Sequence, residues 1–195
     1  MRGMSTDKAH KNTAASVEAL TRRWVNTMVV GLNLCPFAAP VVRQETLRYA
    51  VVESEDTRLA CEAFVDELLV INQANERDIA TTLVIFPNAV ADFYEYLGLL
   101  DECQRLLNQA NLEGVFQLAS FHPGYLFAGP PEDDLSHWTN RSPYPMIHII
   151  REGQMEQVLK HIDDPEAIPE RNIAHLEALG RDKLIELFPP FKDYC

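Results

Sequence analysis

The feature that most restricts the fold is the alternation of short β-rich stretches with amphipathic helical patterns. Strand-like stretches lie at 47–52, 82–86 and 115–121, and a helical pattern separates each of them from the next. Strands that alternate with helices are joined by right-handed crossovers and lie parallel to one another. The sequence therefore predicts an α/β protein in which these three strands form a parallel core covered by their helices.

A fourth strand-like stretch, 146–150, follows the third with no helix between them. We expect it to pair antiparallel with the third strand or to lie beside another strand at an edge of the sheet. The prediction is thus a mixed, mainly parallel sheet of about four strands with helices packed on it, and α+β is the alternative class.

Helical patterns fill most of the remaining chain. The first covers 13–34, and Asp56 is suited to cap the helix that follows the first strand. Two closing helices fit 154–162 and 169–187, the second of which begins at a proline and stops before Pro189. The predicted order is α-β-α-β-α-β-β-α-α.

Length and charge restrict the organisation and the partners. A chain of 195 residues, 47% of them hydrophobic, can bury one core, so we expect a disordered segment at 1–12 and a single globular domain at 13–195. The formal net charge of −12 repels phosphate backbones and anionic lipids, which makes nucleic acid and membrane surfaces unsuitable partners. The sequence carries no signal for an oligomeric state.

The chain is expected in the cytoplasm. No apolar run approaches the roughly 18 residues of a membrane span, and the first residues lack the apolar stretch of a signal peptide. The four cysteines lie far apart and form no C-x-x-C pair, which indicates free thiols in a reducing compartment.

The connection 121–145, FHPGYLFAGPPEDDLSHWTNRSPYP, is the predicted functional site. It is about twice the length of ordinary connections, and long loops in compact domains are functional or disordered. Disordered segments are poor in aromatic residues, whereas this one holds five, among them Tyr125 and Tyr144, which we assign to substrate binding. The loop also leaves a strand at its carboxyl end, where parallel sheets place their ligands.

His122 is the candidate for proton transfer, because imidazole titrates near neutral pH and this residue lies where a strand becomes a loop. The alternative is a structural histidine that caps the strand through a hydrogen bond to the backbone. His137 is expected at the surface. His148 alternates with apolar residues in the fourth strand and is expected to be a hydrogen-bonded core histidine.

Arg141 is the candidate for anion binding. Its planar guanidinium suits a carboxylate or a phosphate, and the flanking Asn140 and Ser142 supply further hydrogen-bonding groups. The alternative is an internal ion pair with Asp133 or Asp134. We assign Arg141, Asn140 and Ser142 to substrate binding.

Cys35 is a candidate nucleophile, because it lies where the first helix gives way to a proline-directed turn. A helix C-terminus carries negative partial charge and disfavours the thiolate, so a small buried hydrophobic residue is the favoured interpretation. A nearby Arg141 or His122 would reverse this preference. Cys35, His122 and His148 would form a metal site only if the fold brought them together, because their spacing is not that of a zinc site. We predict no metal and no cofactor, since glycine-rich phosphate motifs are absent.

Three segments resemble a known family. The runs GLNLCPFA at 31–38, FHPGYLFAG at 121–129 and TNRSPYP at 139–145 are similar to an uncharacterised bacterial family, domain of unknown function fourteen-fifteen. The likeness runs from the first helix to Pro189. It implies a single cytosolic domain and supplies no reaction and no catalytic residue.

Three functions fit these observations. The first is a cytosolic hydrolase or acyltransferase for a small anionic substrate, in which Arg141 and Asn140 hold the anion, His122 moves protons and Cys35 is the nucleophile. The second is a noncatalytic binding or interaction module, in which the polar residues only order the aromatic loop. The third is a metal-dependent enzyme.

Overall fold

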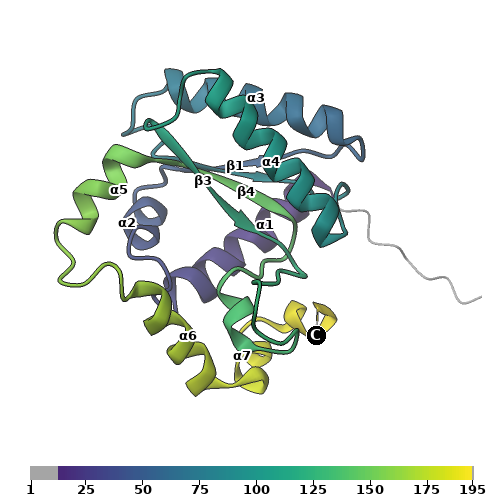
Figure 1. Ribbon diagram of the computed structural model, residues 1–195, viewed down its shortest axis with the longest axis vertical. Helices are drawn as coiled ribbons and strands as arrows, with labels where there is room; N and C mark the ends of the chain where they lie inside the picture. The colour runs from purple at the N-terminus through teal and green to yellow at the C-terminus, as the bar shows by residue number, and fades with distance from the viewer. Residues whose placement is uncertain (1–12, 195) are drawn as a thin grey trace, which may run out of the picture.

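The computed structural model describes residues 13–194, which form three layers: a four-stranded sheet with helices on both faces (Figure 1). The predicted disorder of 1–12 and the thiol of Cys195 lie outside the described residues. Within 13–194, no helix combines the length and the apolarity that a membrane crossing requires.

The sheet contains β1 (Leu47–Val51), β2 (Thr81–Ile85), β3 (Phe116–Phe121) and β4 (Met146–Arg151) in the order β1-β2-β4-β3. β1 and β2 are parallel, whereas β4 is antiparallel to both β2 and β3. The prediction of a mainly parallel sheet was therefore wrong, and most of its pairings are antiparallel. The predicted antiparallel pairing of the third and fourth strands is confirmed.

The antiparallel pairings arise because the connection from β2 to β3 skips one strand position. The chain passes from β2 through α4 to β3 and leaves one strand position vacant between them, and β4 fills that position on its return. β4 reads MIHIIR, so apolar residues occupy both of its faces, as a central strand requires. Ile147 and Ile149 contribute to the core on one face, and Met146 to the core on the other.

Two long helices, α3 (Thr57–Gln73) and α4 (Phe93–Gln109), cover one face of the sheet. Asp56 caps α3 as predicted, since its carboxylate accepts hydrogen bonds from two amides of the first turn, and Asp92 caps α4 in the same way. Their apolar stripes close a core against β2 and β4; the largest fully buried side chains there are Phe64, Leu68, Ile71, Phe86, Tyr96, Leu107 and Phe116.

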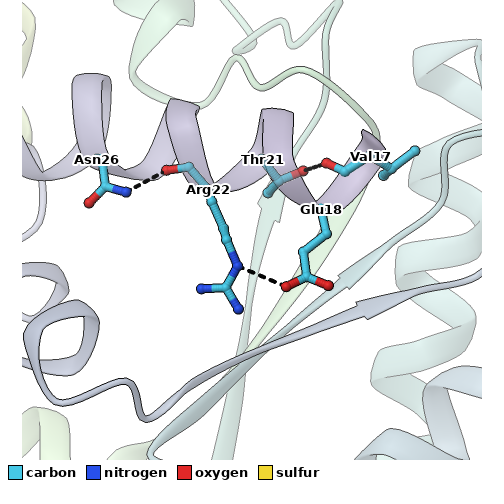
Figure 2. Close-up of polar contacts among 5 residues, drawn as sticks. All are labelled: Val17, Glu18, Thr21, Arg22 and Asn26. Carbon is cyan, nitrogen blue, oxygen red and sulfur yellow. Dashed lines mark hydrogen bonds and ion pairs between the residues drawn. The ribbon is translucent and has the colours of Figure 1, made fainter. Parts of the chain in front are cut away.

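The other face is covered by both ends of the described chain. The α-helix α1 (Ala14–Trp24) continues into a π-helix, η1 (Val25–Val30), and together they account for most of the predicted helix at 13–34. Polar side chains of α1 contact residues one turn earlier in the helix. Thr21 donates a hydrogen bond to the carbonyl of Val17, and Arg22 forms an ion pair with Glu18 (Figure 2). The buried face of these helices packs with α6 (Ile168–Leu179), α7 (Arg181–Leu187) and the 3₁₀ helix η3 (Pro189–Tyr194).

The helices differ from the prediction in two places. The single helix expected at 169–187 is two helices, because Gly180 has φ 74° and ψ 161°, outside the helical region. A short helix, α2 (Ala38–Arg43), precedes β1 and contains Pro40, which concealed it in the sequence. The fifth helix, α5 (Glu152–Leu159), follows β4 directly.

Candidate functional site

The 121–145 loop runs from the carboxyl end of β3 to the start of β4 and contains one turn of 3₁₀ helix, η2 (Leu135–Thr139). Asp134 caps this turn by accepting a hydrogen bond from the amide of Ser136. α6 packs against η2. The loop is thus a folded element held between the sheet and the C-terminal helices.

His137 ties two parts of the loop together. The amide of Phe127 donates to its Nδ1 at 2.9 Å, so the ring proton lies on Nε2, which is 2.8 Å from the carbonyl of Pro131. The side chain is fully buried. The expectation of a surface histidine was wrong, because the loop folds over this residue and uses both of its nitrogens.

His122 lies at the carboxyl end of β3, on the α4 side of the sheet. The amide of Gly124 donates to its Nδ1 at 3.0 Å, which leaves the ring proton on Nε2, 3.1 Å from the carbonyl of Val90. The ring also contacts Phe93 and Tyr96 of α4, with ring centroids 5.4 and 5.1 Å away. Both nitrogens are therefore engaged by backbone groups, as in the structural alternative.

Burial lowers the pKa of His122, and the hydrogen bond to the carbonyl of Val90 opposes that shift only in part. Protonation would place a second proton on Nδ1, where the amide proton of Gly124 already points. The neutral ring with its proton on Nε2 is the form that this surrounding stabilises.

The polar neighbours of Arg141 hold the loop in shape. Asn140 donates to the carbonyl of Ser120, and the buried Ser142 donates to the carbonyl of Tyr144. Tyr125 shares a hydrogen bond with the hydroxyl of Ser120 at 3.1 Å. These contacts are internal to the loop and to the end of β3.

Tyr125 and Tyr144, both assigned to substrate binding, lie on different sides of the sheet. Tyr125 packs against the core beneath α3 and α4, and its ring centroid is 5.0 Å from that of Phe93. Tyr144 packs against the core on the other side, where burial raises the pKa of its hydroxyl. One small ligand cannot contact both rings from the same side of the sheet.

Arg141 is buried, and its guanidinium carbon lies 5.4 Å from the ring centroid of Trp138. A second guanidinium, that of Arg181 in the first turn of α7, lies 6.0 Å from the same ring. Two cations are thus gathered over one indole.

The indole of Trp138 is only 2% exposed, and its Nε1 donor has no hydrogen-bond partner within the described structure. Its ring meets Phe191 edge to face at 5.0 Å, and Phe191 meets Phe188 in the same manner. The guanidinium of Arg23, from α1, lies 5.9 Å from the ring of Phe188. Cations and aromatic rings therefore alternate where the loop meets the C-terminal helices.

Cys35 lies in the turn between η1 and α2. The amides of Phe37 and Ala38 are close enough to hydrogen-bond its sulfur, yet burial dominates and raises the pKa of the thiol. The preceding residue, Leu34, packs into the core on the α1 side of the sheet, whereas His122 packs against α4 on the opposite side. Among residues 13–194 no hydrogen bond joins Cys35 to His122, whose two ring nitrogens are engaged by backbone groups.

His148 lies in β4 on the same face as Met146. Thr81 donates its hydroxyl proton to the carbonyl of Ile149, so it accepts a hydrogen bond from Nε2 of His148 at 2.6 Å. Cys35, His122 and His148 form no common site, and within 13–194 no three His, Cys, Asp or Glu side chains are arranged to hold a metal ion.

Comparison with known proteins identifies the family. A family model described as "Protein of unknown function (DUF1415)" matches residues 16–186, which is most of the chain. The chain belongs to the DUF1415 family. No curated protein and no solved structure gives a significant match.

In this DUF1415 chain, the sequence pattern singled out the loop and Arg141 as candidates, whereas Arg181 and the contacts of Trp138 appear only in the structure. Arg181 follows Gly180 at the start of α7, and no local pattern connects it with a tryptophan more than forty residues earlier. The aromatic content of residues 188–191 was the one available signal that the C-terminus packs on the loop.

Proposed function

We propose that this chain is a noncatalytic binding protein for a small anionic molecule carrying a carboxylate or a phosphate. The site lies where the 121–145 loop meets the start of α7. Arg181 and Arg141 provide the charge, and Trp138 provides an additional N–H donor.

The observation that carries this proposal is the unsatisfied donor of Trp138 beside two cations. A buried indole N–H without an acceptor costs free energy, roughly 1 to 3 kcal/mol. Two guanidiniums lie over the same ring, and guanidiniums only donate hydrogen bonds. An oxyanion supplies the acceptor that the indole lacks and the negative charge that the two cations attract.

The distribution of charge supports the same site. Arg22, Arg48, Arg58, Arg105 and Lys183 each form an ion pair with a glutamate. Arg181 forms none of them; its polar contact is with the backbone carbonyl of Asp133 at 3.5 Å. An exposed arginine with no carboxylate partner among these residues, in a chain of net charge −12, is available to an anionic ligand.

The contacts of His122 favour binding over catalysis. A general base needs a nitrogen that can reach the substrate proton, and both nitrogens of His122 are hydrogen-bonded to backbone groups. Leu34, next to Cys35, packs into the core on the other side of the sheet from His122, which argues against the pair that the hydrolase or acyltransferase hypothesis requires.

Fluorescence titration tests the proposal. In a Trp24→Phe background, Trp138 is the remaining tryptophan, so its emission should change saturably when phosphate or a small dicarboxylate is added. Arg181→Ala should weaken the binding of that anion by roughly tenfold or more, because it removes a charged hydrogen-bond donor. Arg141→Lys should weaken it as well, since lysine keeps the charge but loses the planar fork.

Arg58→Ala is the matched control, because Arg58 is an exposed arginine whose partner is Glu62 on α3. It should leave the affinity unchanged. If no anion alters the emission of Trp138, or if Arg58→Ala and Arg181→Ala weaken binding equally, the proposed site is wrong.

A further inference from the structure

A pair of cysteines lies on the opposite side of the sheet from the proposed anion site, where α3 packs against α4. Cys61 belongs to the first half of α3 and Cys103 to the middle of α4, and these two helices pack against each other. Cys61 packs against the core cluster that contains Cys103, and each thiol influences the pKa of the other. The two cysteines therefore lie near each other on neighbouring helices of the folded protein.

The two thiols differ in their access to solvent. Cys103 is completely buried, whereas Cys61 is partly exposed and lines a groove of about 640 Å³ between the helices. Gly98 of α4 also lines this groove, and no atom lies within 4 Å of the position that a Cβ would occupy there. A small solute can thus reach the sulfur of Cys61 first.

We propose that Cys61 and Cys103 form an intramolecular disulfide when the folded protein meets a hydroperoxide. The Cys61 thiolate attacks the peroxide, an S–O bond forms, the O–O bond breaks, and a sulfenic acid and one water (from hydrogen peroxide) result. The sulfur of Cys103 then attacks the sulfur of Cys61; an S–S bond forms, the S–O bond breaks, and the oxygen leaves as a second water. The two thiols lose two electrons, and the peroxide gains them.

The surroundings predict that this oxidation is slow near neutral pH. Burial raises the pKa of the Cys61 thiol, and Glu102 and Glu62 raise it further, against the opposing influences of Cys103 and Arg105. Burial also raises the pKa of Cys103. Because the thiolate is the reactive form, the rate should increase as the pH rises toward the pKa of Cys61.

The disulfide would connect the outer helices and close the chain segment that contains β2. That segment also supplies Val90, Phe93 and Tyr96, which hold His122. Oxidation on one side of the sheet would therefore cross-link the segment that supports the 121–145 loop and restrict its unfolded conformations.

The full-length protein can be treated with hydrogen peroxide at about pH 7 and about pH 9, alkylated, digested and analysed by mass spectrometry. We expect a peptide pair linked through Cys61 and Cys103, formed faster at the higher pH. Cys35→Ser should form the same link, and Cys61→Ser should not. Conversion of Cys61 to sulfinic acid without a link to Cys103, or a rate that does not rise with pH, would overturn the proposal.

Discussion

Protonation of the His148 imidazole makes the stability of the folded sheet depend on pH. Its Nε2 donates to Thr81, whose own proton is held by the carbonyl of Ile149, and burial lowers the pKa of the ring to about 4. In the unfolded chain the same ring takes up a proton at a pH of about 6.5. Its contribution to stability is therefore complete above that value and is lost as the pH falls toward 4.

We predict that the free energy of unfolding falls by up to about 3 kcal/mol between pH 7 and pH 4 on account of His148. His122, whose pKa burial also lowers, adds a loss in the same direction. Urea unfolding across this pH range measures the slope. His148→Gln should reduce the slope while His122 remains, and equal slopes for the two proteins would contradict the assignment.

The histidines also mark what sequence can and cannot predict about a site. The position of the loop followed from its length and its aromatic residues, and Arg141 followed from its type and neighbours. The structural role of His122 was one of two alternatives and the buried role of His137 was missed, because their partners are backbone groups of Val90 and Phe127 that only the folded chain brings near. Hydrogen bonds to the backbone leave no residue pattern to recognise.

At the scale of elements, one glycine between two helices and one glycine within a helix allow a comparison of what each contributes to stability. Gly180 separates α6 from α7 with φ 74° and ψ 161°, a conformation that residues with a Cβ rarely adopt. Gly98 lies within α4, where a Cβ would project into open space. The first glycine is required by the backbone, whereas the second only lowers helix propensity.

Gly180→Ala should therefore destabilise the protein by about 1 to 3 kcal/mol, and Gly98→Ala should stabilise it by up to about 1 kcal/mol. Thermal unfolding of both variants measures these changes. A neutral Gly180→Ala would mean that α6 and α7 can join into one helix, as the sequence pattern alone predicted.

The elements themselves were predictable where the local signal was complete. The strand and helix alternation, and the cap at Asp56, needed only neighbouring residues. The position of β4 was not predictable, because it depends on the space left between β2 and β3 by a crossover. α2 was missed because Pro40 is a residue that normally argues against a helix interior.

For the whole molecule, the position of β1 at the edge of the sheet predicts an alternating pattern of amide exchange. The amide of Ala80 donates to the carbonyl of Thr46, and the amide of Val52 donates to the carbonyl of Ile85. The backbone N–H and C=O groups of the even-numbered residues of β1 therefore point toward β2. The amides of Leu47, Tyr49 and Val51 face away and have no partner within residues 13–194. Their exchange should be faster than that of Arg48 and Ala50 by about tenfold or more.

Hydrogen exchange followed by NMR resolves these five amides individually. β2 and β4, which are central strands with cores on both faces, should give the slowest amides. Uniform protection along β1 would contradict the open edge and would indicate that another chain pairs with it.

The central place of β4 also governs when the sheet can be completed during synthesis. Until residues 146–151 have left the ribosome, β1 can pair with β2, but β3 has no neighbouring strand within the sheet. The nascent chain thus carries two separate partial structures, and the arrival of one six-residue strand joins them. A ribosome paused before residue 146 would hold β3 with its pairing edge open to other chains.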